Sequence, residues 1–190
     1  MKAELKKLLA RRQKLSIRAA DRVPAAVLVP IYENGGDYHI VFIKRTETVK
    51  THKGQISFPG GGRESRDRTL LDTARREAAE EIGLKLADIE VLGELDDEVT
   101  MTSNYIVTPF VAAIPWPYRF VKNSNEVDEI IEVPIRDLLA KGCLRPNTEV
   151  LNGKGTDSYA YHYQGRVIWG ATARILNKLL EIIGRIKADG

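Results

Sequence analysis

The feature that most constrains this chain is an acidic helix that follows a run of glycines. Apolar residues recur at helical spacing over residues 70–82, and Gly83 then ends the pattern as a C-cap glycine does. Before this helix, residues 55–58 have the pattern of a short strand, which stops at the glycine-rich segment 59–62. A chain with this order must place a strand end, a tight backbone loop and a helix beside one another.

Three glutamates lie within one turn of the predicted helix. Glu77, Glu80 and Glu81 stand at positions i, i+3 and i+4, so their carboxylates share one face and repel one another. They also lie near the helix C-terminus, where the macrodipole disfavours acids. A divalent cation would offset both effects, and oxygen ligands favour Mg²⁺ or Mn²⁺ over zinc. The carbonyl of Gly60 is a further candidate ligand, and an ordinary acidic helix face is the alternative.

The rest of the chain alternates between strand and helix patterns. Predicted strands lie at residues 25–30, 38–44, 55–58, 89–95, 105–114, 130–133, 159–163 and 167–169. Predicted helices lie at residues 2–13, 70–82, 135–139 and 171–186. Because several strands follow one another directly, we expect an α/β domain with a mixed sheet. No internal repeat is visible, so we expect one domain over residues 1–190, with residues 1–20 as an N-terminal helical extension.

The composition is that of a globular protein, and its single cysteine fits a reducing compartment. Hydrophobic residues make up 43% of the 190 positions and charged residues 29%, which excludes a disordered chain. Cys143 is the single cysteine, so an intramolecular disulfide is excluded and we expect a cytoplasmic location. No apolar run approaches the roughly 18 residues needed to cross a bilayer. The net charge of +3 does not indicate a nucleic-acid partner, while a homodimer stays open.

Opposite charges are concentrated in two segments of the chain. Residues 44–53 are basic, whereas residues 77–98 are strongly acidic. This distribution predicts an anion and a cation bound near each other, and two solvated surface patches are the alternative.

The strand, glycine loop and glutamate helix together resemble the signature of the Nudix hydrolase family. The positions that match are Gly61, Arg76, Glu77, Glu80, Glu81 and Gly83. The middle glutamate of that signature does not match. Counted from Gly61 its position holds Asp67, counted back from Arg76 it holds Arg68, and the segment is one residue longer than the general form. The resemblance implies an α/β/α sandwich in which a mixed sheet lies between helices.

The segment upstream of the glycine loop resembles the coenzyme A diphosphatase branch of the same family. The matching positions are residues 41–46, Lys50, Gly54 and residues 58–61, and the stretch 168–176 is also similar to this branch. Thr46 stands where serine or alanine is usual. Lys50 replaces an arginine, so it keeps the positive charge but loses the planar, bidentate guanidinium.

The resemblance implies a role for each matching residue. Glu77, Glu81 and the Gly60 carbonyl would hold Mg²⁺ or Mn²⁺, and Glu80 would be a third ligand or a base held by Arg76. The general base varies within the family, and among the acids of residues 125–129 we select Glu126. The residues implied in substrate binding are Arg45, Lys50, Gly54 and Phe58, and His52 and Lys53 are further candidate phosphate contacts.

The implied activity is metal-dependent hydrolysis of the diphosphate bond of coenzyme A or an acyl-CoA. The products would be 3′,5′-ADP and 4′-phosphopantetheine or its acyl form. One alternative keeps the chemistry but acts on ADP-ribose, dinucleotides or another nucleoside diphosphate derivative, with capped RNA as a minor variant. Another alternative is a non-catalytic Nudix module that binds a nucleotide.

Overall fold

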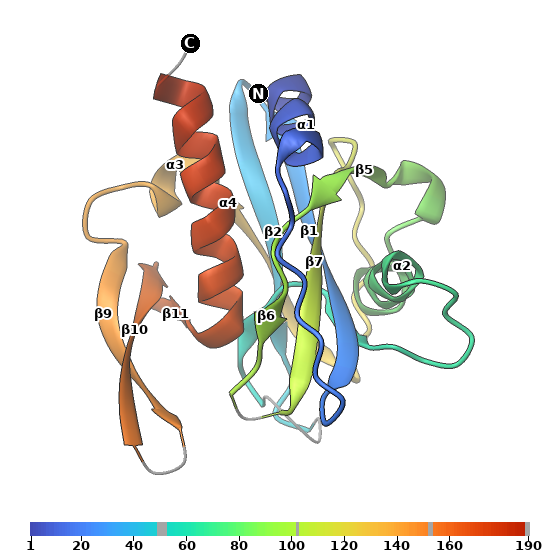
Figure 1. The fold of residues 1–190 in the computed structure, drawn as a ribbon. Coiled ribbons are helices and arrows are strands. Elements are labelled where there is room, and N and C mark those ends of the chain that lie inside the picture. The colour runs from blue at the N-terminus through green and yellow to red at the C-terminus, as the bar shows by residue number, and fades with distance from the viewer. Residues whose placement is uncertain (49–52, 102, 152–153, 189–190) are drawn as a thin grey trace.

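The computed structural model, which describes residues 1–48, 53–101, 103–151 and 154–188, is a layered α/β fold (Figure 1). A central mixed sheet lies between helix α2 on one face and helices α1 and α4 on the other. This arrangement confirms the predicted fold class. Within the described part of the chain, no helix is long and apolar enough to span a membrane.

The central sheet is built around two long parallel strands. Its strands are β1 (Val23–Asn34), β2 (Asp37–Arg45), β3 (Ile56–Ser57), β4 (Gly60–Gly62), β5 (Glu90–Glu94), β6 (Glu98–Val99), β7 (Tyr105–Ala113) and β8 (Val127–Pro134). Strands β1 and β7 pair in parallel, and the main order is β3-β2-β1-β7-β5. Strands β4, β6 and β8 pair antiparallel with β1, β7 and β2 respectively. The sheet is therefore mixed, as the sequence predicts.

Strand β1 shows why this sheet needs cover on both faces. Ala25, Val29 and Ile31 point into the core beneath α1 and α4. Ala26 and Leu28 point into the core beneath α2. Alternate side chains reach opposite faces of a strand, so a nearly continuous apolar run is stable only with helices on both sides.

The helices begin and end close to the predicted residues. They are α1 (Lys2–Arg11), α2 (Leu70–Ile82), the short α3 (Ile135–Leu138), a 3₁₀ turn η1 (Leu86–Asp88) and α4 (Gly170–Ala188). Helix α2 starts with a capping box, in which the Thr69 hydroxyl accepts from the Asp72 N–H and the Asp72 carboxylate accepts from the Thr69 N–H. It ends at Gly83, whose φ of 69° is the left-handed conformation expected of a C-cap glycine.

A second, smaller sheet was only partly predicted. It consists of β9 (Leu144–Leu151), β10 (Lys154–Tyr163) and β11 (Arg166–Ile168), in the order β11-β10-β9. The sequence predicts the hairpin of β10 and β11 but not strand β9. Residues 144–157 contain proline, asparagine and glycine and lack a clear apolar alternation, so their pattern is that of a loop.

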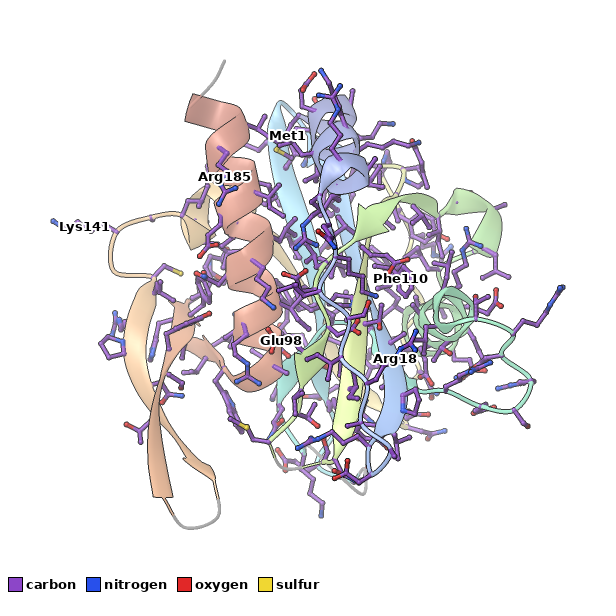
Figure 2. The ribbon with its side chains drawn as sticks, in the orientation of Figure 1. Met1, Arg18, Glu98, Phe110, Lys141 and Arg185 are labelled. Atoms are coloured by element: carbon purple, nitrogen blue, oxygen red, sulfur yellow. The ribbon has the colours of Figure 1, made fainter. Side chains whose placement is uncertain are left out.

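The acidic segment 77–98 divides into two parts with different surroundings. Its second part lies against α4 and the N-terminal segment, where Figure 2 labels Glu98. Asp96 pairs with Arg12, Asp97 pairs with Lys14 at 3.0 Å, and Glu98 pairs with Lys178 at 2.7 Å. These acids therefore join segments of the fold through ion pairs, so the predicted cation site concerns the first part of the segment.

We expect Glu98→Gln to lower the free energy of unfolding by about 2 kcal/mol. Glu98 is 9% exposed, accepts from Arg174 at 3.0 Å and pairs with Lys178 at 2.7 Å, so Glu98→Gln removes the negative charge from both contacts. The matched control is Glu90→Gln, which removes an acid paired with two exposed lysines and should leave stability unchanged within error. Urea unfolding of both variants measures the difference, and equal stability would contradict the assigned role.

Candidate functional site

The glycine loop brings backbone and carboxylate unusually close together. Strand β4 pairs with β1, with Gly61 opposite Ala26. A Cβ on Gly61 would lie 2.5 Å from Oε1 of Glu77, and a Cβ on Gly60 would overlap the Ala26 carbonyl oxygen. Only glycine leaves room for helix α2 to present its acids at this strand.

The backbone of Gly60 points toward helix α2. The Leu28 N–H donates to the Pro59 carbonyl, so residue 59 faces β1 and, by the alternation of an antiparallel ladder, residue 60 faces away from it. The Gly60 N–H donates to Oε2 of Glu81 at 2.9 Å. Because the N–H and C=O of an extended residue point to the same side, the Gly60 carbonyl also faces the acids, which supports its predicted part in metal binding.

Glu81 is the most buried carboxylate of this group. Its side chain is 1% exposed and also accepts from Nη1 of Arg45 at 3.0 Å. Burial raises the pKa of Glu81 to about 8, and the nearby charges of Glu77 and Glu126 act in the same direction, while the Gly60 N–H and Arg45 oppose the shift. A buried acid of this kind gains from a further positive charge beside it.

Glu77 has a similar environment, whereas Glu80 does not. Burial raises the pKa of Glu77, Arg76 opposes this, and the charges of Glu80 and Glu126 raise it further. The Glu80 side chain is 45% exposed and contacts Arg66 at 2.9 Å and Arg76 at 3.1 Å. The structure therefore places Glu77 inward, and it places Glu80 at the rim of the group.

The main partner of Arg76 is Asp67 and not Glu80. Nε and Nη2 of Arg76 donate to the two oxygens of Asp67 at 3.0 and 2.9 Å, which is a bidentate contact. The predicted contact with Glu80 is present, but the sequence did not assign a role to Asp67. Arg76 also donates to Glu77 at 2.7 Å and to the Gly62 carbonyl at 3.1 Å, so one guanidinium joins the loop to the helix.

Asp67 is itself held in place by its own loop. Its carboxylate accepts from the Glu64 N–H at 2.9 Å and from the Thr73 hydroxyl at 3.0 Å, and the residue is 5% exposed. The hydrogen bonds from Arg76, followed by those from Glu64 and Thr73, hold the pKa of Asp67 well below its usual range. In this longer loop, an aspartate therefore pairs with Arg76 at the position of the unmatched middle acid.

The remaining predicted residues fall in different places. Arg45 and Glu126 line the same cavity, with Nη2 of Arg45 3.9 Å from Oε2 of Glu126. Phe58 also lines this cavity and stacks on Phe42 at 4.8 Å, so it belongs to the core as well. Gly54 has a φ of 63° in a turn and is not among the cavity-lining residues, which favours a conformational role. Lys50 and His52 lie outside the described residues.

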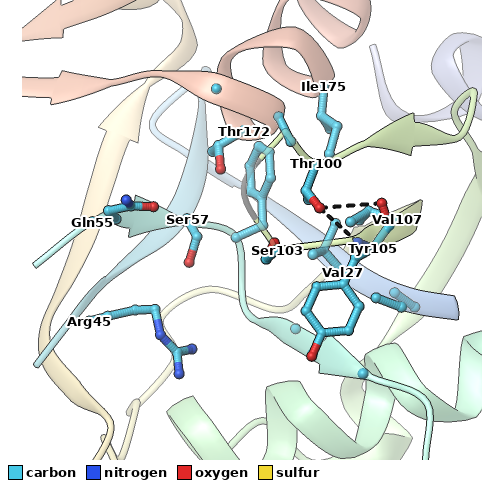
Figure 3. A pocket seen from close by; sticks show the side chains of 18 of the residues that line it. Val27, Arg45, Gln55, Ser57, Thr100, Ser103, Tyr105, Val107, Thr172 and Ile175 are labelled. Atoms are coloured by element: carbon cyan, nitrogen blue, oxygen red, sulfur yellow. Dashed lines mark hydrogen bonds between the residues drawn. The ribbon is translucent and has the colours of Figure 1, made fainter. Parts of the chain in front are cut away.

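The cavity has a volume of about 560 Å³ (Figure 3). Arg45, Glu77 and Glu126 line it together with the glycine loop. Lining residues that sequence reasoning did not select include Ser57, Ser103, Tyr105, Trp169, Thr172 and Ile175. The similarity noted over 168–176 could have indicated the last three, whereas Ser57, Ser103 and Tyr105 carry no distinctive local pattern.

The donor set of this site fits a hard divalent cation. Its candidate ligands are carboxylates and one carbonyl, and the buried acids repel one another. Among the described residues, no three acids, histidines or cysteines are arranged to share one ion, and arginines contact carboxylate oxygens of Glu77 and Glu81. The chemistry of the group therefore suits Mg²⁺ or Mn²⁺, although these contacts would have to change on binding.

The layered fold and the acid-lined cavity beside a glycine loop define a protein of the Nudix hydrolase class. The NUDIX domain family matches residues 22–151, so the chain belongs to this family and is a pyrophosphohydrolase. Nudix hydrolases act on nucleoside diphosphate derivatives and generally use divalent metal ions.

Two curated relatives have similar lengths. The chain is 34% identical over 157 residues to a protein named "Uncharacterized Nudix hydrolase NudL" from Photorhabdus laumondii. The aligned residues make up 83% of this chain and 83% of that protein. It is 34% identical over 155 residues to a protein of the same name from Pectobacterium atrosepticum, which covers 82% of this chain and 80% of that protein.

Solved structures support the fold. A MutT/nudix family protein from Enterococcus faecalis matches with a TM-score of 0.58 at 15% identity, over 99% of this chain and 75% of the other. A C. elegans Ap4A hydrolase matches with a TM-score of 0.57 at 14% identity, over 88% of this chain and 99% of the other. At these identities the comparison shows the shared architecture alone.

We expect Asp67→Asn to lower the free energy of unfolding by about 2 kcal/mol near neutral pH, because Arg76 loses its bidentate partner. Since folding lowers the pKa of Asp67, its contribution is complete above the unfolded value of about 3.9 and is lost as the pH falls toward the folded value. Urea unfolding at about pH 7 and about pH 3 should therefore show a smaller difference between the two proteins at the lower pH. A difference that does not change with pH would contradict this account.

Proposed function

We propose that this protein hydrolyses the diphosphate bond of coenzyme A or an acyl-CoA, with Mg²⁺ or Mn²⁺ as cofactor. The observation that carries the proposal is one cavity that holds Glu77, Glu126 and Arg45 beside the glycine loop, with Glu81 buried behind them. The choice of substrate rests on the similarity of residues 41–61 to the coenzyme A diphosphatase branch. Coenzyme A carries a diphosphate and a further phosphate, so it suits a basic segment next to acids.

The protein residues have separate tasks in this proposal. Glu77 and Glu81, together with the Gly60 carbonyl, would hold the metal. Glu80, at the rim of the group, would be a third ligand or a base held by Arg76. When bound, the metal neutralises the charge that develops on the phosphate oxygens. Arg76 positions Glu77 and Glu80 through its contacts at 2.7 and 3.1 Å, and Asp67 holds Arg76 in turn.

Glu126 is the proposed general base. Its side chain is 45% exposed at the cavity and accepts from Asn123 at 3.4 Å, so it is accessible to a water molecule. It would take a proton from the attacking water, whose oxygen bonds to phosphorus as the bridging P–O bond breaks. Arg45 would turn toward a phosphate oxygen of the substrate. Its Nε is buried and has no hydrogen-bond partner among the described residues.

The products of this reaction would be 3′,5′-ADP and 4′-phosphopantetheine, or the acyl form of the latter. We further propose that residues 1–190 act as one domain in the cytoplasm, and a homodimer stays a prediction. ADP-ribose, dinucleotides and other nucleoside diphosphate derivatives are the second class of substrate, consistent with the family's general activity. A non-catalytic module is disfavoured, because such a module has no need of buried, mutually repelling acids at Glu77 and Glu81.

A panel assay tests the substrate. We expect purified protein to convert coenzyme A to both named products with Mg²⁺ or Mn²⁺, and to lose all turnover with a chelator, because the acids alone cannot neutralise the developing charge. The same preparation should act more slowly on ADP-ribose and on dinucleotides. Rapid turnover of ADP-ribose with none of coenzyme A would reject the substrate but keep the class of enzyme.

Glu81→Gln tests the metal assignment. We expect kcat to fall by several orders of magnitude, because one charged ligand is lost without a cavity in the core. The fold should persist, since glutamine keeps a side-chain oxygen as acceptor for the Gly60 N–H. The control is Glu4→Gln on the exposed surface of α1, which should retain full kcat. Near-normal kcat in Glu81→Gln would show that Glu81 is not a metal ligand.

A further inference from the structure

The cavity has two chemically different ends. Arg45, Glu77 and Glu126 form the charged end near helix α2. In Figure 3, Thr172 and Ile175 enter from the top of the view, above Arg45, and they belong to the first turns of α4. The apolar lining residues include Phe58, Val107, Trp169 and Ile175, together with small side chains of β1. The second end therefore presents a mostly apolar surface next to the proposed reaction centre.

Neutral hydrogen-bonding groups interrupt this apolar surface. The side chains of Ser57, Ser103 and Thr172 line the cavity and make no hydrogen bond to other described residues. Oγ of Ser103 is fully buried without a partner among the described residues, which is costly unless a ligand satisfies it. Hydroxyls can donate to a carbonyl or accept from an N–H, so they suit amide groups.

This end is poorly suited to a second nucleoside or a second phosphate group. A ribose diol is commonly bound by a carboxylate, and a phosphate is bound by Arg or Lys. Among the described lining residues the acids are Glu77 and Glu126 and the cation is Arg45, and all three belong to the charged end.

The wall that carries Thr172 and Ile175 is held rigidly. Arg174 donates to Glu98 at 3.0 Å and to the Val99 carbonyl at 2.8 Å. These contacts join α4 to β6, directly before Thr100, which also lines the cavity. A preformed wall lowers the cost of ordering the site when a ligand binds.

We propose that this second end binds an apolar arm that contains amide groups and is attached to the diphosphate, as in pantetheine and its acyl thioesters. The arm packs against Trp169 and Ile175, and its amides bind the hydroxyls of Ser103 and Thr172. This inference rests on the proposed function, because it names the part of the substrate that this half of the cavity selects. The nucleotide then lies toward the charged end and the solvent.

Trp169→Ala and Thr172→Val test the proposal by kinetics. We expect Trp169→Ala to raise KM for coenzyme A and a medium-chain acyl-CoA about tenfold through lost apolar contact. Thr172→Val, which keeps the side-chain shape, should raise the same KM values about threefold through one lost hydrogen bond. Neither variant should change KM for ADP-ribose. If ADP-ribose is not cleaved, its inhibition constant against coenzyme A hydrolysis should stay unchanged instead. The matched control is Trp116→Ala, since both tryptophans are 38% exposed and Trp116 lies outside this cavity, stacked on Tyr32.

A binding measurement separates this inference from the proposed function. In a Trp116→Phe background, Trp169 is the single tryptophan and its fluorescence reports on the second end. We expect S-decanoyl-4′-phosphopantetheine, which lacks the nucleotide, to change this fluorescence saturably, and 5′-ADP to leave it unchanged. Saturable binding without hydrolysis of coenzyme A would support the subsite and reject the proposed function.

Two results would overturn the subsite. One is an equal rise in KM for ADP-ribose and coenzyme A in Trp169→Ala, which would show that the indole contacts the shared nucleotide. The other is hydrolysis of coenzyme A by a protein whose Trp169 fluorescence does not respond to the phosphopantetheine probe. Either result leaves the proposed hydrolytic activity standing.

Discussion

The site depends on two arginines that hold repelling carboxylates at short range. Arg76 binds Asp67 through two hydrogen bonds and reaches both Glu77 and Glu80. Arg45 donates to Glu81 at 3.0 Å. Burial and the charges of Glu77 and Glu126 raise the pKa of Glu81 to about 8, and Arg45 opposes this rise. The arginines therefore offset part of the repulsion between the acids, and a bound cation would offset more of it.

The glycine loop supplies the other half of this arrangement. Strand β4 lies so close to Glu77 and to the backbone of β1 that side chains at Gly60 and Gly61 would overlap them. This proximity also aims the Gly60 backbone at Glu81. The loop thus contributes its backbone groups and the helix contributes its side chains. The site needs both segments, and both are visible in the sequence pattern.

Most of the fold could be predicted because its signals are local. Apolar periodicity indicated α2 and α4, and Gly83 marked a helix end that the structure confirms. Strand β9 was missed because its residues lack alternation and its stability comes from pairing with β10. The pairing of Glu98 with Lys178 and Arg174 was equally hidden, because these residues are 80 and 76 positions apart and only the fold brings them together.

The candidate site shows the same division. The sequence indicated Glu77, Glu81 and Gly60, which belong to one continuous segment with a distinctive spacing. It assigned no function to Tyr105 or Ser103, whose place in the cavity depends on how β7 pairs with β1. The role of Asp67 was also missed. The added residue in its loop places Asp67 one position further from Arg76 than the general signature has it, and only the folded loop brings the two side chains into contact.

The placement of the cavity walls has a consequence for how such proteins can diversify. The acids and the glycine loop lie within the matched region 22–151, whereas Trp169, Thr172 and Ile175 follow it. Changes in the C-terminal strands and in α4 can therefore reshape one wall while the hydrolytic residues stay untouched. In such a layout, substitutions in the last quarter of the chain can change which substrates are preferred, while the hydrolytic activity is kept.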